Sequence, residues 1–230
     1  MEKPTPGRAS MILRSSLHCL LFSILIYGSG CYVPAIIAAR VLPPETIHAK
    51  YVGLQGQTVG VMVWTDRGPQ IDYPNLGLDL ANSLQKKLLA STGKDGPPEL
   101  KESKFPVLPA SIARYQQDHP GIGARNIAEV APRLGVSRLI YIEVNEFGTR
   151  AAASVDLYKG SMETSIKVVE VIGNTAKIAY EESGIKATYP PKVPEDGTPD
   201  GDDLRFYSGT VDAMSTEILL KLISHPSEEI

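Results

Sequence analysis

Cysteine is almost missing from this sequence: Cys19 and Cys31 are the two cysteines among 230 residues. Cys19 lies within an apolar run near the amino terminus that we expect to be removed. The mature chain would then keep Cys31 as its one thiol. An internal disulfide is impossible in such a chain, and a zinc site made from a cysteine cluster is excluded as well.

Histidine is scarce too, with four residues, and no two of them have the spacing that places both imidazoles on one helical face around zinc. The sequence also lacks the G-x-S-x-G nucleophile elbow, the G-x-x-x-x-G-K-[ST] phosphate loop and the G-x-G-x-x-G dinucleotide fingerprint. We therefore expect no metal, no cofactor and no enzymatic activity.

Excess positive charge is missing as well. The net charge is −3 for the whole chain, and Lys3, Arg8 and Arg14 all lie in the first 30 residues, so the remainder is more acidic still. Binding to nucleic acid is not expected, because it needs a basic surface. Attachment to a membrane would have to come from a lipid, since an acidic domain gains nothing from an acidic bilayer surface.

A secretory signal is the clearest feature that the sequence does contain. Arg14 precedes an apolar run over residues 17–27, and the small residues Gly28, Ser29 and Gly30 follow. This is the layout of a signal peptide, and the run is shorter than the ~20 residues of a membrane span. Met11 would be a more compact start for this signal than Met1.

The small residues end at Cys31, and the stretch resembles the lipobox of bacterial lipoproteins. In that family the cysteine receives the lipid and a dedicated peptidase cuts before it. The resemblance implies a signal peptide over residues 1–30 and lipid, such as palmitate, on Cys31. Gly28 departs from the family, which usually has an aliphatic residue there. The alternatives are a signal cleaved nearby, with a free thiol, and an uncleaved anchor.

Residues 58–223 are predicted to form one α/β domain, between a lipidated tether or packing arm over residues 31–57 and a polar tail over residues 224–230. Apolar and alternating patterns predict strands at 58–65, 105–108, 138–147, 161–172 and 175–187. Leucine and other apolar spacings predict helices at 74–91, 111–118, 124–134, with a bend at Pro132, and 204–222, capped by Asp203. The elements predict a two-layer sandwich, a mixed sheet with helices packed on it, that ends in an amphipathic helix.

Three segments carry a resemblance to a known group: the strand VGVMVW, the helix LGLDLANSLQKKLLAS and the helix-to-strand junction RLGVSRLIYIEV. Their order over residues 56–188 resembles the TolB amino-terminal domain group, which includes curli-secretion and penicillin-binding-protein-activator lipoproteins. The resemblance implies an α/β domain used for envelope assembly or partner binding. It carries over no functional residue, because no functional motif of the group is matched.

Asp66, Arg67 and Asp72 are the candidate residues for a ligand or partner site. They follow the first strand, and loops beyond the carboxyl ends of strands often line binding crevices in α/β sheets. The alternative is an exposed loop. The aspartates of residues 189–203 favour a solvated loop, with a calcium site as the alternative.

The function favoured by these features is that of a lipid-anchored envelope protein, facing the periplasm from the outer membrane. It would act without catalysis, by binding an envelope protein or by self-association. Two alternatives stay open. One is an envelope hydrolase acting on cell-wall material, which needs two facing carboxylates. The other is a small-molecule or lipid carrier, which needs a cavity of at least ~300 Å³.

Overall fold

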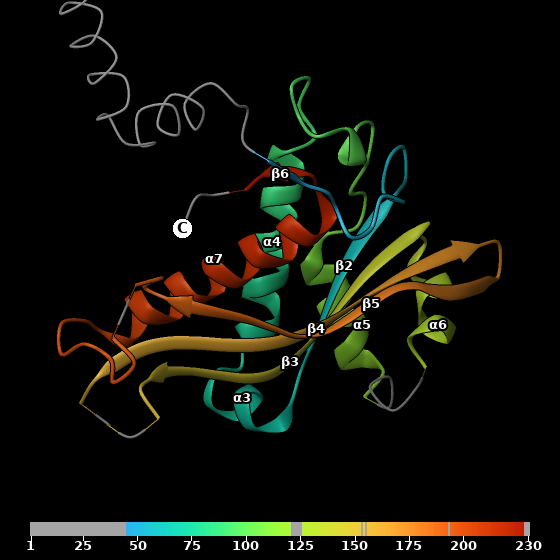
Figure 1. The fold of residues 1–230 in the computed structure, drawn as a ribbon. Coiled ribbons are helices and arrows are strands. Elements are labelled where there is room, and N and C mark those ends of the chain that lie inside the picture. Colours follow the sequence, from blue (N-terminus) through green and yellow to red (C-terminus); the bar gives the residue numbers. More distant parts are fainter. Residues whose placement is uncertain (1–44, 121–125, 153, 155, 193, 228–230) are drawn as a thin grey trace, which may run out of the picture. The chain divides into compact units, whose positions relative to one another are not determined.

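A four-stranded mixed sheet forms the centre of the fold (Figure 1). Its strands are β2 (Val59–Thr65), β3 (Arg138–Arg150), β4 (Tyr158–Ile172) and β5 (Thr175–Tyr189), in that order across the sheet. β2 runs parallel to β3, whereas β4 runs antiparallel to both of its neighbours, β3 and β5. The predicted fold class, a mixed sheet with helices packed on it, is therefore confirmed.

The computed structural model describes residues 45–120 and 126–227, apart from 153, 155 and 193. The helices and strands in these residues belong to the unit that runs from Thr46 to Pro226. Gly28, Cys31 and the predicted signal lie outside the described residues. Within the described part of the chain, no helix combines the length and the apolar character needed to cross a bilayer.

Both faces of the sheet are buried, and the alternation along β3 shows why. Ile140 and Ile142 point into one apolar core, while Leu139 and Tyr141 point into a second core on the opposite face. Successive side chains of a strand point to opposite faces, so a strand that is apolar at every position needs cover on both.

Helices α4 (Leu76–Ala90) and α7 (Asp203–Leu222) cover the first face (Figure 1). The predicted leucine stripe of α4 faces this core, and its four members are fully buried: Leu76, Leu80, Leu84 and Leu88. The two helices are also joined by a hydrogen bond of 2.8 Å between Ser83 Oγ and Ser215 Oγ.

The second face is covered by α5 (Pro109–Asp118), α6 (Ile127–Val130) and the 3-10 turn η3 (Ala131–Leu134). The change from α to 3-10 geometry comes next to Pro132, where a bend was predicted, because proline cannot donate the hydrogen bond that would continue the α-helix.

Three local predictions were wrong. Residues 105–108 form no strand; the one bridge nearby joins Lys104 to Thr58. The loop expected after β2 is instead the short helix α3 (Arg67–Asp72). Its first turn accommodates Pro69, because the N–H groups there have no helical partner in any case. The cap of α7 is Asp202, whose side chain accepts from the N–H of Arg205, and not Asp203.

The folded unit also extends beyond residues 58–223. Tyr51 and Leu54 are buried in the first core, so this part of the predicted arm packs on the domain. Strand β1 (Thr46–Ile47) pairs with β6 (His225–Pro226), and the 3-10 turn η1 (Pro98–Leu100) brings the buried Leu100 into the same core.

Candidate functional site

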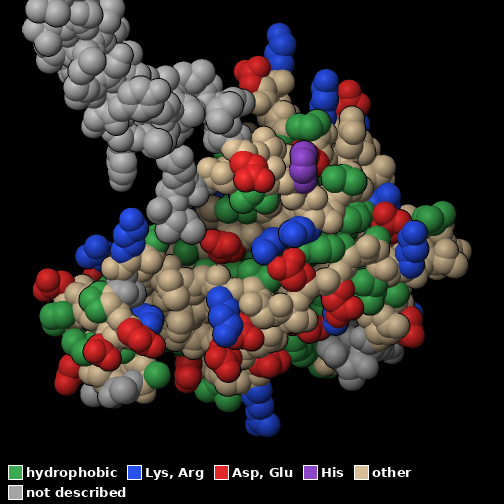
Figure 2. All heavy atoms as spheres, in the orientation of Figure 1, with side chains coloured by type: hydrophobic (Ala, Val, Ile, Leu, Met, Phe, Trp, Pro, Cys, Tyr) green, Lys and Arg blue, Asp and Glu red, His purple; other side chains and the backbone are tan. Residues whose placement is uncertain are grey.

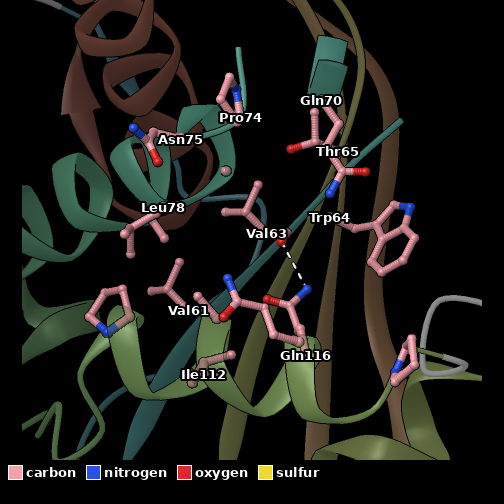
Figure 3. A pocket seen from close by; sticks show the side chains of 16 residues that line it. Val61, Val63, Trp64, Thr65, Gln70, Pro74, Asn75, Leu78, Ile112 and Gln116 are labelled. Carbon is pink, nitrogen blue, oxygen red and sulfur yellow. Dashed lines mark hydrogen bonds between the residues drawn. The ribbon is translucent and has the colours of Figure 1, made fainter. Parts of the chain in front are cut away.

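A groove of about 400 Å³ lies between α4 and α5, beside β2 (Figure 3). Its apolar lining comes from β2 and from both helices: Val61, Val63, Leu78, Ala81, Ile112 and Ala113. Uncharged polar side chains form much of the rest of the lining: Thr65, Gln70, Asn75, Gln116 and Gln117. Trp64, Gly77 and three prolines, Pro74, Pro109 and Pro120, also line the groove.

The groove lies at the open edge of the sheet, because β2 has one neighbouring strand only. The backbone N–H of Arg138 donates to the Thr58 carbonyl, and the backbone N–H of Asp66 donates to the Val144 carbonyl. The even-numbered residues of this segment therefore bond to β3. Backbone groups alternate in direction along a strand, so the N–H and C=O groups of Val61, Val63 and Thr65 point to the open edge.

The start of that edge is covered by the chain itself. The N–H of Val59 donates to the Lys104 carbonyl at 2.7 Å, in a short parallel pairing. The chain then turns away into α5 through Pro106 and Pro109, neither of which can donate to a strand. The predicted strand at 105–108 would have continued along β2, and its absence leaves β2 without a neighbouring strand on this side from Val61 onward.

Farther along the edge, a side chain takes the place of a neighbouring strand. Gln116 Nε2, from α5, donates to the Val63 carbonyl at 3.0 Å (Figure 3). The groove is closed at its base, where Val61 is fully buried and Val63 is 7% exposed, and it opens towards the partly exposed Trp64 and Thr65.

A glycine lets α4 approach this edge closely. A Cβ at position 77 would lie 3.0 Å from Thr65 Oγ1 and 3.6 Å from the Val63 carbonyl oxygen. Ala81 and Ala113 add little volume on the two helices. Gly77 therefore lets α4 lie against the strand, while Ala81 and Ala113 leave space between the two helices.

Charge distinguishes the lining of the groove from the face of the molecule shown in Figure 2. On the face shown in Figure 2, acidic and basic side chains are interspersed. Among the residues that the structure describes, no charged side chain lines the groove. A ligand that enters it would meet amides, a hydroxyl group, an indole ring and aliphatic groups.

The predicted site residues Asp66, Arg67 and Asp72 lie next to the groove but not in its lining. All three are exposed on or beside α3, whereas Gln70 of the same helix does line the groove. Their role in binding stays a prediction. Gln116 and Asn75 were missed, because an uncharged amide side chain in a helix or turn carries no signature in a sequence.

The other polar clusters of the domain connect its elements to one another. Tyr207 Oη donates to Asp79 Oδ2 at 2.6 Å, and burial raises the pKa of this phenol above its ordinary value. Tyr207 also packs on Tyr73, at the end of α3, and on Phe147 of β3, so α7 is joined to both segments. No group of three or more His, Cys, Asp or Glu side chains that could hold a metal ion is found in the described ranges.

The sequence matches no protein-family model and no curated protein. Solved structures with a similar arrangement include a PelC dodecamer, a hypothetical protein and a lipoprotein. The PelC dodecamer from Paraburkholderia phytofirmans is 9% identical, with a TM-score of 0.43, and the match covers 78% of this chain and 96% of that one. The hypothetical protein CT253 from Chlamydia trachomatis is 14% identical, with a TM-score of 0.41 and coverages of 72% and 93%.

The third similar structure is lipoprotein GNA1162 from Neisseria meningitidis. It is 12% identical, with a TM-score of 0.40, and the match covers 70% of this chain and 93% of that one. At such scores a likeness does not establish a shared function. The resemblance to the TolB group stays a prediction.

Proposed function

We propose that this protein is a lipid-anchored lipoprotein of the bacterial envelope that acts by binding a protein partner in the groove beside β2. The observation that carries the proposal is the open strand edge inside an uncharged groove, since strand edges are sites at which other chains pair. Binding at this edge needs no catalytic group.

The anchor is supported by the sequence. A basic and apolar signal leads through small residues to Cys31, in the order typical of bacterial lipoproteins. Diacylation with a further acyl chain at the new amino terminus would give a stable attachment, because one acyl chain alone holds a protein only marginally. The outer membrane, with the domain in the periplasm, is the location that we propose.

A carrier of a small apolar molecule is the second candidate. The groove, at about 400 Å³, falls within the range of small-molecule sites, and its base is aliphatic. A hydrolase finds less support, because among the described residues the groove lining contains no carboxylate to form a facing acid pair.

Mass spectrometry of the native amino-terminal peptide tests the anchor. We expect a peptide that begins at Cys31 and carries the mass of attached acyl chains, and we expect Cys31→Ser to leave the membrane fraction. A peptide that begins elsewhere, or an unmodified Cys31, would overturn the anchor.

Chemical cross-linking in a detergent extract of the native membrane tests the partner. The lipidated chain is expected to cross-link reproducibly to one envelope protein or to a second copy of itself. Recovery of the chain as an uncross-linked monomer at every cross-linker length would contradict the proposal.

A further inference from the structure

We infer that the groove takes an extended, uncharged peptide segment, which adds to the sheet alongside β2 at Val63–Thr65. This inference rests on the proposed function, since it specifies how a protein partner would enter the groove. It commits to a polypeptide backbone as the occupant and to hydrogen bonds at the strand edge as the means of recognition.

The first argument is the direction of the backbone groups. The N–H groups of Val63 and Thr65 point to the open edge, and no hydrogen bond to either of them is found among the residues that the structure describes. Backbone groups inside proteins are nearly always paired, so donors beside a groove are matched by an acceptor that comes with a ligand or with water. A peptide supplies acceptors and donors at the spacing of a strand.

The second argument is that an amide already occupies one position of this edge. Gln116 Nε2 donates to the Val63 carbonyl at 3.0 Å, as the N–H of an adjacent strand would. Gln116 is partly exposed, so a rotation of its side chain would free the carbonyl for an incoming N–H. Gln117 and Asn75 offer further amide groups along the groove, and amides pair well with peptide groups.

The third argument is the character of the lining. An uncharged groove would leave a charged side chain of the peptide desolvated and unpaired, which is costly. The aliphatic groups of Val61, Ala81 and Ile112 suit a small apolar side chain. The segment from Val63 to Thr65 spans three residues, or roughly 10 Å at a rise of ~3.3 Å per residue.

The opposite edge of the sheet, formed by β5, differs from the edge formed by β2. β5 carries charged side chains in ion pairs with β4, Lys177 with Glu170 and Lys186 with Glu163, and its pairing contains two register shifts. Charges and bulges are the features that keep strand edges from pairing with other chains. The sequence of β2, VGVMVWT, has no charged residue.

A selection from random heptapeptides displayed on phage, against the full chain in detergent, tests the inference. Ala113→Trp, which fills the groove, is used for counter-selection, and Ala110→Trp on an exposed position of the same helix is the control. We expect uncharged peptides that bind the wild type and the Ala110→Trp variant but lose at least tenfold in affinity on Ala113→Trp. A selection that yields no groove-dependent peptide, or only charged peptides, would overturn the inference.

Two substitutions at one position then test the strand edge. Thr65→Pro removes an N–H that points away from β3, whereas Thr65→Val keeps that N–H and removes the hydroxyl group. We expect the selected peptides to lose at least tenfold in affinity on Thr65→Pro and less than threefold on Thr65→Val. Equal affinities would contradict recognition through the backbone.

Hydrogen exchange on the wild-type chain gives an answer even if Thr65→Pro does not fold. Binding of a selected peptide is expected to slow exchange of the Thr65 N–H at least tenfold, and an unchanged rate would contradict strand addition. Different results would contradict the proposed function and this inference. A protein partner cross-linked through the groove, with no protection of Thr65, would leave the proposed function standing and remove this inference.

Discussion

At the scale of single residues, Asp202 fixes the start of α7. Its side chain accepts a hydrogen bond of 2.8 Å from the N–H of Arg205, one of the donors that a helix leaves unpaired in its first turn. Asp203, the next residue, instead bonds to Arg150 at 2.7 Å and to Thr149 at 2.9 Å. Two adjacent aspartates thus have separate tasks, a cap and an ion pair.

Replacement of the cap is expected to weaken the domain. Asp202→Ala should lower the free energy of unfolding by about 1 kcal/mol, the usual effect of losing an N-cap. Urea denaturation followed by circular dichroism measures this change. The control is Asp200→Ala, at an exposed position just before the helix, which should change the free energy of unfolding by less than about 0.5 kcal/mol. Equal effects of the two substitutions would contradict the assignment of the cap.

Glu170 makes the stability depend on pH in a predictable direction. A hydrogen bond from Lys177 lowers the pKa of this carboxyl group most, and hydrogen bonding from Tyr51 and the charge of Arg138 lower it further. The stabilisation that the charged Glu170 provides to the folded state is complete above the pKa that this carboxyl group has in the unfolded chain. It is lost as the pH falls through the lowered pKa of the folded protein.

The corresponding test compares Glu170→Gln with the wild type across that acid range. The difference between their free energies of unfolding, expected to be below roughly 1 kcal/mol because the cluster is partly open to water, should shrink as the pH falls. A difference that stays constant or grows towards acid pH would show that the carboxylate charge plays no stabilising part.

At the scale of elements, α4 presents one face to the core and one to water. Leu84 is fully buried and Leu89 is 49% exposed, although both are leucines of the same helix. Leu84→Ala should cost 2–5 kcal/mol, because it leaves a cavity, and Leu89→Ala less than about 1 kcal/mol. Thermal unfolding of the two variants measures the difference. Similar costs would mean that α4 lies on the sheet in another orientation.

Several elements were predictable because their patterns act locally. The leucine spacing of α4, the fully apolar run of β2 and the glycine turn between β4 and β5 each determine an element with no knowledge of the rest of the fold. The bend at Pro132 is of the same kind. These features were enough to predict the fold class.

The groove was not predictable, because it depends on where the chain leaves the sheet. Residues 105–108 have the composition of a short edge strand, yet Pro106 and Pro109 lack the N–H groups that would continue the pairing begun at Lys104. The sequence predicted a site in the segment after β2, and this segment does border the groove. The predicted site residues are charged, whereas amide side chains line the groove.

At the scale of the whole molecule, the folded unit begins before the first strand of the sheet. Leu54 has no exposed surface and belongs to the core beneath α4 and α7. Leu54→Ala is expected to cost 2–5 kcal/mol in denaturant unfolding, against less than about 0.5 kcal/mol for the exposed neighbour Gln55→Ala. Equal, small costs would mean that residues 51–57 are a tether and not part of the domain.

The anchor and the groove together give the proposed action of the molecule. Lipid on Cys31 would hold the domain at a membrane surface, and the edge of β2 would bind a protein that reaches it. Confinement at one surface raises the effective concentration of two partners, so a short contact of about three residues can suffice.

Photo-cross-linking in the native cell tests this account most directly. A photoreactive residue replaces Gln117, an exposed residue of the groove, or Lys94, an exposed residue beyond the far end of α4. In the lipidated chain we expect a discrete cross-linked protein from position 117, absent from position 94 and lost on Ala113→Trp. Cross-links that are equal at the two positions, or unchanged by Ala113→Trp, would contradict the account.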